Sequence, residues 1–427
     1  MFVYKNNKNQ GVNNMAHYSR WQAPVITKAL KTRRVILIAG ARQCGKTTLA
    51  KTLVSPSSLY RTLDDKLLLE AAKTDPQAFI KKNNDTHPLM IIDEVQKAVD
   101  LIPAIKMAVD ENTNPGQYLL TGSADLQSLP GVTESLAGRI RKIPLRPLAQ
   151  GEIEENLPYF LDNSFNQNWP PAQKNLSRDE IINIALRGGY PEPLYFESYD
   201  RTLWHQNYID TLLERDLKDI VNIRRQDSME KLVLVIAAWS TKPIDISAIG
   251  SSLSLQRQTL ETYLNALQNL YLIDRIPAYS GTDYDRIGNQ SKLIMNDSGL
   301  MASILRWQLE DIRFDGDRVG KLIETHVGNE LQKHIDASEN RYVLSHYRDK
   351  DKREIDYLIT DPHGDLLGIE VKASTSPSLS DFKNLQWFKE NLTPKNKKFT
   401  GIVLYTGPHV LSMGNNLWAV PIPCLYG

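Results

Sequence analysis

The sequence predicts an α/β protein in which a parallel sheet covered by helices comes first, a helical part follows, and a mixed α/β part ends the chain. Three observations predict this order. Short apolar runs alternate with helical patterns over residues 16–150, which is typical of a parallel sheet. Apolar positions then recur at helical spacing over residues 178–223 and 227–272. From residue 292 onward the pattern is again mixed α/β.

Composition narrows the class of protein. A chain of 427 residues is long enough for two or three domains. With 41% hydrophobic and 24% charged residues it is neither a mostly disordered chain nor a rod. The 51 Lys and Arg residues balance 50 Asp and Glu residues, so any contact with nucleic acid must be local. No strongly apolar run approaches the roughly 20 residues of a membrane span, so we expect no membrane.

The cysteine count and the first residues bear on location. Two cysteines, Cys44 and Cys424, form no disulfide framework and suit a reducing cytosol, so we expect a cytoplasmic protein. Residues 1–15 are polar and rich in Asn, which predicts a disordered leader; translation would start at Met1 or at Met15.

The first functional element is a glycine-rich turn at residues 40–47, which matches G-x-x-x-x-G-K-[ST]. An apolar strand, residues 35–38, precedes it, and a helix can follow from residue 48. Its backbone N–H groups would surround phosphate oxygens, Lys46 would reach the β- and γ-phosphates, and Thr47 would hold Mg²⁺. The predicted nucleotide contacts are Gly40, Ala41, Arg42, Gln43, Cys44, Gly45, Lys46, Thr47 and Thr48.

The second element is a buried strand, residues 89–94, that ends in two carboxylates. Asp93 would hold Mg²⁺ through water, and Glu94 would polarise the attacking water. The pair could merely cap a strand, but that alternative is weak beside a phosphate loop. Glu94 therefore favours hydrolysis over passive nucleotide binding.

Two further polar groups follow. The strand at residues 117–123 ends in Thr121 and Ser123, and either side chain could sense the γ-phosphate; a simple strand-end turn is the alternative. Arg139 stands just before the strand at 140–145 and could act as an arginine finger toward a neighbouring subunit, which implies a homo-oligomer. The alternative for Arg139 is a solvated helix-end arginine.

The order of these motifs resembles a known family. Residues 93–97, 120–123, 136–139, 188–192, 214–217 and 292–300 look like the motifs of bacterial and archaeal AAA-type ATPases that carry a C-terminal domain of unknown function. The resemblance spans nearly the whole chain after Met15. It implies a P-loop AAA-type domain that uses ATP and Mg²⁺, with Thr121 and Ser123 as sensors and Arg139 as the finger. It also implies that Pro191 begins a helical lid and touches the base or ribose; Pro191 as a simple helix stop is the alternative.

The helical middle contains a helix-turn-helix pattern over residues 246–260, and residues 272–276 could begin a wing. This resembles the winged-helix module of the same family. If the module reads DNA, the side chains that face outward are Gln256, Arg257, Gln258 and Glu261. Few basic residues flank it, which favours the alternative of a packing module.

The last part carries a constellation of carboxylates. Glu324 lies on a predicted helix, Asp356 on a strand, and Glu370 and Lys372 share one face of the returning strand. The spacing resembles a restriction-endonuclease-like core, D…ExK preceded by a helical Glu. A divalent ion held by Glu324, Asp356 and Glu370 would activate water, and Lys372 would orient that water or neutralise charge. The alternative is a structural ion-pair cluster in a degenerate nuclease fold used for binding.

We therefore expect five segments: a leader (1–15), an AAA-type ATPase domain (16–150), a linker with a helical lid (151–225), a winged-helix-like module (226–290) and a restriction-endonuclease-like domain (291–427). The expected function is ATP hydrolysis with Mg²⁺, coupled to DNA binding or DNA processing by the C-terminal domain. The alternative is a signalling or assembly ATPase whose C-terminal domain binds a protein partner and is catalytically inactive.

Overall fold

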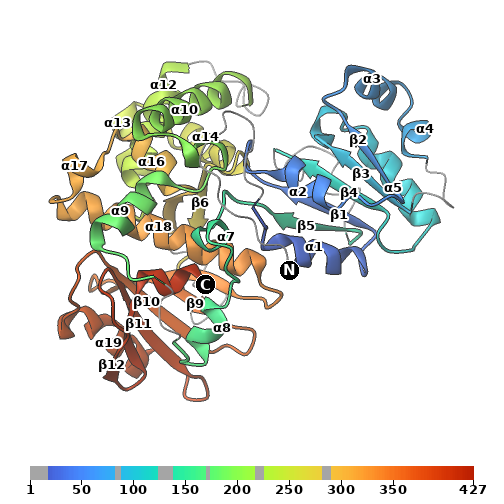
Figure 1. The fold of residues 1–427 in the computed structure, drawn as a ribbon. Helices are drawn as coiled ribbons and strands as arrows, with labels where there is room; N and C mark the ends of the chain where they lie inside the picture. Colours follow the sequence, from blue (N-terminus) through green and yellow to red (C-terminus); the bar gives the residue numbers. More distant parts are fainter. Residues whose placement is uncertain (1–17, 82–87, 124–137, 170–173, 217–225, 281–289) are drawn as a thin grey trace, which may run out of the picture.

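A computed structural model describes residues 18–81, 88–123, 138–169, 174–216, 226–280 and 290–427 (Figure 1). The predicted leader and Met15 lie outside the described residues. So do residues 136–137 of the motif before Arg139.

The first part of the chain is a five-stranded sheet in which every neighbouring pair is parallel, in the order β2-β3-β4-β1-β5. The uniformly apolar strand β1 is fully buried, as expected for a strand covered on both faces. The strands are β1 (Val35–Ala39), β2 (Ser58–Thr62), β3 (Leu89–Asp93), β4 (Tyr118–Gly122) and β5 (Ile140–Pro144). This confirms the predicted parallel α/β domain.

Helices cover this sheet on both faces, and each face has its own apolar core. Side chains alternate along a strand, so Leu37 joins one core and Ile38 the other. The helices are α1 (Gln22–Leu30), α2 (Lys46–Thr52), α3 (Lys66–Thr74), α4 (Pro76–Ile80) and α5 (Leu101–Glu111), with a 3₁₀ turn, η1 (Val95–Lys97). Because the strands are parallel, their carboxyl ends meet at one edge, where the predicted phosphate loop follows β1.

Most helices of the middle part lie above the last sheet and to one side of the first sheet (Figure 1). Its elements are α7 (Gln150–Ile153), α8 (Phe160–Phe165), α9 (Arg178–Arg187), η3 (Glu192–Tyr195), α10 (Ser198–Thr211), the π-helical turn η4 (Leu212–Asp216), α12 (Gln226–Trp239), α13 (Ile246–Leu253), α14 (Arg257–Asn269), β6 (Ile273–Ile276), β7 (Lys292–Met295), α16 (Ser298–Ile304) and α17 (Leu309–Ile312). The antiparallel pair β6–β7 follows α13 and α14, which is the element order expected of a winged helix.

The apolar side chains of α14 point inward as its helical spacing predicts, and Leu260, Leu264 and Leu267 are buried. Gln256, Arg257 and Gln258 are exposed. Glu261 is partly exposed, and its carboxylate lies 3.6 Å from Arg275 on β6. The winged-helix assignment itself stays a prediction.

The last part is a mixed six-stranded sheet in the order β12-β13-β11-β10-β9-β8. Neighbours among β8, β9 and β10 are antiparallel, whereas β10–β11 and β11–β13 are parallel. Its elements are α18 (Gly316–Ala337), β8 (Val343–Arg348), β9 (Glu354–Thr360), β10 (Leu366–Lys372), η5 (Leu379–Phe382), α19 (Lys383–Asn391), β11 (Phe399–Tyr405), β12 (Leu411–Gly414), β13 (Leu417–Pro421) and η6 (Ile422–Tyr426). The hairpin predicted to join Asp356 to Glu370 is therefore present.

One continuous apolar core joins the three parts. It contains Ile38 of the first sheet, Leu264 of the helical middle and Ile369 of the last sheet. The long helix α18 contacts α9, α16 and β10, and it lies between the last sheet and the rest of the molecule.

Candidate nucleotide site and carboxylate cluster

The loop after β1 has the backbone geometry that its glycines allow. Gly45 has φ of 100°, in the region that side chains with a Cβ rarely adopt. A Cβ on Gly40 would lie 1.9 Å from the carbonyl oxygen of Leu145, so the loop passes against the chain after β5. Lys46 is 4% exposed, and its ammonium donates to the carbonyl oxygens of Gly40 (3.0 Å) and Ala41 (2.7 Å).

Asp93 is the centre of a hydrogen-bond cluster at the carboxyl edge of the sheet. Its carboxylate accepts from Thr47 Oγ1 at 3.0 Å, from Tyr60 OH at 3.0 Å and from Thr121 Oγ1 at 2.6 Å. These donors come from α2, β2 and β4, so three neighbouring elements fix the carboxylate that ends β3. The Thr47 hydroxyl and the Asp93 carboxylate are oxygen donors of the kind that Mg²⁺ prefers, so the site fits that ion.

Glu94 is held beside Asp93 by its own backbone. Its φ of 61° places it in the left-handed region, and its N–H donates to Thr121 Oγ1 at 3.0 Å. Gln96 donates to the Glu94 carboxylate and to Ser123 Oγ, the latter at 2.9 Å. Thr121 therefore touches both predicted catalytic carboxylate residues directly, whereas Ser123 reaches Glu94 only through Gln96.

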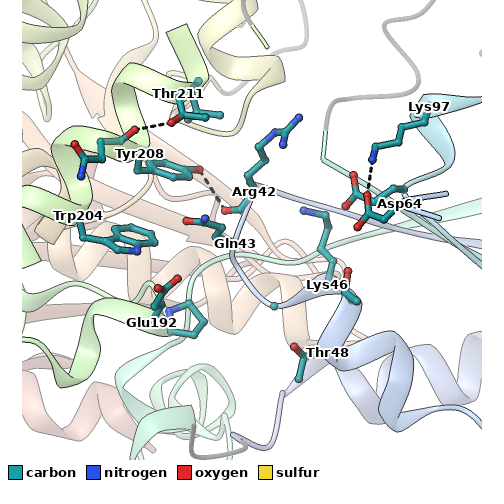
Figure 2. A pocket seen from close by; sticks show the side chains of 16 residues that line it. Arg42, Gln43, Lys46, Thr48, Asp64, Lys97, Glu192, Trp204, Tyr208 and Thr211 are labelled. Carbon is teal, nitrogen blue, oxygen red and sulfur yellow. Dashed lines mark hydrogen bonds and ion pairs between the residues drawn. The ribbon is translucent and has the colours of Figure 1, made fainter. Parts of the chain in front are cut away.

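A cavity of about 610 Å³ opens between the phosphate loop and α10. Figure 2 shows Trp204, Tyr208 and Glu192 facing the loop that carries Arg42, Gln43 and Lys46. Trp204 and Tyr208 stack with ring centroids 5.3 Å apart, and Tyr208 OH donates to the Arg42 carbonyl oxygen at 3.3 Å. Sequence reasoning missed both aromatic residues, because nothing in their spacing separates a cavity-lining pair from an ordinary helix face.

A second cavity, of about 880 Å³, lies on the other side of the loop. Gly45, Thr48 and Pro191 line both cavities, while Tyr18 and Tyr195 line only the second. The hydroxyls of Tyr18 and Tyr195 are 2.5 Å apart. The structure thus brings Pro191 beside the phosphate loop, and its predicted contact with the base or ribose stays a prediction.

Arg139 lies far from the phosphate loop of its own chain. It precedes Ile140, which pairs with Val35 at the start of β1, whereas the loop follows Ala39 at the other end. Its guanidinium forms a two-pronged ion pair with Asp110 on α5. A finger role within one chain is therefore excluded by position, and the role toward a neighbouring subunit stays a prediction.

The predicted carboxylate constellation is assembled around a lysine that the sequence reasoning did not include. Lys292, on β7, is 0% exposed, and its ammonium lies 2.7 Å from Glu324 Oε1 and 3.7 Å from Asp356 Oδ1. Glu354 contributes a third carboxylate at 3.7 Å. Burial alone would lower the pKa of Lys292, but attraction to Glu324, Asp356 and Glu354 raises it above its usual value.

Glu370 and Lys372 pair with each other on β10, at 3.2 Å. Glu370 is 6% exposed, and burial together with Asp356 raises its pKa well above the usual range. Burial and Asp356 raise the pKa of Glu324 to about 7, although Lys292 acts to lower it. Asp356 Oδ2 accepts from the backbone N–H of Val371 at 2.9 Å.

The carboxylates are paired with lysines in this structure, and the metal site predicted at Glu324, Asp356 and Glu370 stays a prediction. In the ranges that the structure describes, no three His, Cys, Asp or Glu side chains are arranged to hold a metal ion. The reason is visible in the contacts, because Glu324 and Asp356 are directed to the Lys292 ammonium and Glu370 is directed to Lys372. The proposed roles of Glu370 and Lys372 in catalysis remain predictions.

Two of the sequence motifs meet in space. The Asp297 carboxylate accepts from the backbone N–H of Gly189 at 2.8 Å. A Cβ on Gly188 would lie 2.2 Å from Asp297 Oδ1, which explains why glycine stands there. The turn that leads to Pro191 therefore rests directly on the segment that precedes α16.

Comparison with known proteins identifies the first part. Residues 32–154 match the family model described as "AAA domain". Residues 178–311 match "Domain of unknown function (DUF8612)", and residues 319–425 match "Domain of unknown function (DUF4143)". The AAA match and the five-stranded parallel sheet with its phosphate loop make the first part a P-loop AAA-type domain with a nucleotide-binding site. The winged-helix and restriction-endonuclease-like assignments stay predictions.

Whole-chain relatives are distant. An uncharacterized protein of Mycobacterium tuberculosis and one of Mycobacterium bovis are each 26% identical over 398 residues, which cover 93% of this chain and 82% of the relative. Among solved structures, Aeropyrum pernix Orc1 in complex with DNA is 13% identical, with a TM-score of 0.26, over 66% of this chain and 90% of that one. Pyrobaculum aerophilum Cdc6p is 13% identical, with a TM-score of 0.23, over 67% and 92%.

Within the described ranges, no helix is both long enough and apolar enough to cross a bilayer.

Proposed function

We propose that this protein hydrolyses ATP with Mg²⁺. The observation that carries the proposal is the cluster in which Asp93 binds Thr47 and Thr121 while Thr121 also accepts from the Glu94 N–H. A protein that only bound nucleotide would need the phosphate loop and Lys46 but no carboxylate after Asp93. A carboxylate held in a fixed place directly after the metal-binding residue is the arrangement that positions an attacking water.

The roles follow from the contacts. Thr47 and Asp93 would hold Mg²⁺, which supplies neutralisation of phosphate charge when bound. Lys46 would exchange its bonds to the loop carbonyls for bonds to phosphate oxygens. Glu94 orients water and accepts its proton, and Thr121 keeps Glu94 and Asp93 in register.

The test is steady-state ATP hydrolysis by Lys46→Ala and Glu94→Gln. We expect Glu94→Gln to bind ATP but to lose at least about 100-fold in rate, the size typical of a lost general base. Lys46→Ala should lose ATP binding. The matched control is Lys73→Ala, an exposed lysine on α3, which should behave as wild type. Full activity in Glu94→Gln would overturn the role of Glu94.

We infer that the ATPase domain controls a C-terminal domain that binds a protein partner. This is the function of a signalling or assembly ATPase. The support is the Lys292 ammonium in the carboxylate cluster.

A chain of contacts links the phosphate loop to the helical middle and to α18. Arg20 donates to the phosphate-loop carbonyl of Cys44 at 2.7 Å and to the carbonyl of Arg146 at 2.7 Å. Arg146 pairs with Asp274 on β6 and Asp336 on α18.

DNA processing is the second candidate, and the placement of Asp356, Glu370 and Lys372 on adjacent strands favours it. The test is cleavage of linear, single-stranded and branched DNA with Mg²⁺ or Mn²⁺, with and without ATP. Cleavage that is lost in Glu370→Ala would establish the nuclease. No cleavage with intact ATP hydrolysis supports the binding role, and salt-dependent retention of DNA would then identify DNA rather than a protein as the partner.

Assembly is the remaining proposal. We expect Arg139 to act on ATP bound to a neighbouring copy in a homo-oligomer. A monomer that hydrolyses ATP at the normal rate would overturn that role.

A further inference from the structure

The carboxylate cluster of the last sheet already contains a cation. The Lys292 ammonium donates to Glu324 Oε1 at 2.7 Å and to the carbonyl oxygen of Asp356 at 3.1 Å. The carboxylates of Asp356 and Glu354 each lie 3.7 Å away. Four oxygen atoms from α18 and β9 thus surround one positive charge.

This ammonium lies deeper than the carboxylates. The Lys292 side chain is 0% exposed, whereas Glu324, Glu354 and Asp356 are 18%, 32% and 16% exposed. All three carboxylate residues line a cavity of about 790 Å³, together with Arg348. The cluster is therefore reachable from solvent on one side and backed by a buried charge on the other. A buried ammonium is tolerated only when it is paired in this way.

The lysine comes from outside the domain that supplies the carboxylates. Lys292 belongs to β7, which pairs with β6 of the helical middle, whereas the match to the last domain begins at residue 319. The tie between the two parts is therefore electrostatic as well as apolar.

A second observation concerns the remaining carboxylate. Glu370 is 6% exposed, and its Oε1 atom finds no hydrogen-bond partner among the described residues. The Oε1 atom of Glu370 is thus buried without a hydrogen-bond partner next to Asp356. A carboxylate oxygen of this kind could bind a cation if one entered the cluster.

We propose that Lys292 is the resident cation of this cluster and excludes divalent metal ions from it. A dication at Glu324 and Asp356 would stand within a few ångströms of the ammonium, and like charges at that distance repel strongly where water is scarce. Metal-dependent cleavage is therefore absent while β7 holds its place. This inference rests on the binding role proposed for the last domain, and it gives a physical reason for binding without cleavage.

The test is Mn²⁺ binding, followed by electron paramagnetic resonance, to the full-length protein without nucleotide. Lys292→Met removes the charge and keeps the length of the side chain. We expect Lys292→Met to gain one Mn²⁺ site, at least ten-fold tighter than any site in wild type, and to lose it again when Asp356→Asn is added. Lys292→Arg keeps the charge and should gain none.

The matched control is Lys242→Met, an exposed lysine that lines the same cavity and should change nothing. If Lys292→Met binds no Mn²⁺ although it is folded, the proposal is overturned. If Lys292→Met fails to fold, the comparison of wild type with Asp356→Asn decides the question. A wild-type Mn²⁺ site that Asp356→Asn removes would overturn the proposal, and identical titrations of wild type and Asp356→Asn would support it. ATP hydrolysis in the same samples reports on the first sheet, so failure of the hydrolase proposal gives a different result.

Discussion

Thr121 controls the geometry of the nucleotide site, because its single hydroxyl donates to Asp93 and accepts from the Glu94 N–H. Thr121→Val keeps the shape and removes both bonds. We expect kcat for ATP hydrolysis to fall about 10- to 100-fold with little change in KM, since binding relies on the loop. Steady-state kinetics measures both. Thr62→Val is the matched control, because Thr62 lies 3.4 Å from the same carboxylate and should matter little. Equal losses in the two variants would contradict the prediction.

The close contact between Gly188 and Asp297 makes the stability of the fold depend on a glycine at position 188. Gly188→Ala would put a Cβ 2.2 Å from Asp297 Oδ1 at a φ of 71°, so we expect a loss of about 1–3 kcal/mol in the free energy of unfolding. Gly320→Ala is the comparison, because Gly320 lies inside α18 with no atom within 4 Å of the new Cβ. It should stabilise by up to about 1 kcal/mol. Thermal unfolding of the two variants decides, and a neutral Gly188→Ala would show that Asp297 moves freely.

For single residues, the sequence predicts motifs made of contiguous residues, but it does not predict contacts between residues that lie far apart in the chain. The phosphate loop, Asp93 and Glu94 are read from contiguous residues, because the chemistry demands those types at that spacing. Tyr60 binds Asp93 only because β2 lies beside β3. Lys292 lies 32 residues before Glu324 and reaches it only through the packing of β7 against α18. No spacing rule in one sequence carries that information.

Among elements, one arginine forms ion pairs with both the helical middle and α18. Arg146 lies 2.5 Å from Asp274 and 2.6 Å from Asp336. Burial raises the pKa of Asp336, and Arg146 acts to lower it. Arg146→Ala would leave these carboxylates without their cation, and we expect a loss of about 3–5 kcal/mol.

Thermal unfolding measures the effect. Arg318→Ala is the control, since Arg318 pairs with Asp315 at an exposed end of α18 and should cost under about 1 kcal/mol. A result for Arg146→Ala as small as that of the control would mean that water replaces the lost charge. If ATP hydrolysis becomes insensitive to a partner in Arg146→Ala, the contact chain from Arg20 carries the coupling.

Element patterns were the best-predicted level. The buried face of α14 and the β9–β10 hairpin follow from periods of 3.6 and 2, which are local properties. The antiparallel pairing that carries Lys292 into the carboxylate cluster depends on the register between β6 and β7, which lies beyond periodicity. The partner of Glu261, Arg275 on the neighbouring strand, was likewise not predictable from helical spacing.

For the whole molecule, buried histidines set a response to acid. Burial lowers the pKa of His205 to about 3 and of His326 and His346 to about 4. These values lie below about 6.5 in the unfolded chain, so the stabilising contribution is present above pH 6.5 and is lost as pH falls toward the folded values. Buried acids with raised pKa values, such as Glu324, act in the opposite direction, so the prediction concerns a difference between variants.

His326→Gln keeps a polar partner for Tyr426 OH, which lies 3.0 Å from His326 Nε2. Between pH 7.5 and pH 5 the wild type should lose roughly 2 kcal/mol more than this variant, at about 1.4 kcal/mol per pH unit below 6.5. Denaturant unfolding at both pH values measures the difference. His363→Gln, in an exposed turn, should follow the wild type. Parallel curves for wild type and His326→Gln would contradict the prediction.

The core that runs from Ile38 through Leu264 to Ile369 has a consequence for how such a chain can change over time. A module that keeps its own closed core can be exchanged between genes, because cutting it out exposes little. Here a cut between β5 and α7, or between α17 and α18, would leave apolar side chains exposed on both fragments. We therefore expect recombination to keep the three parts in one gene. A new activity would arise through substitutions at the nucleotide site or the carboxylate cluster rather than through exchange of domains.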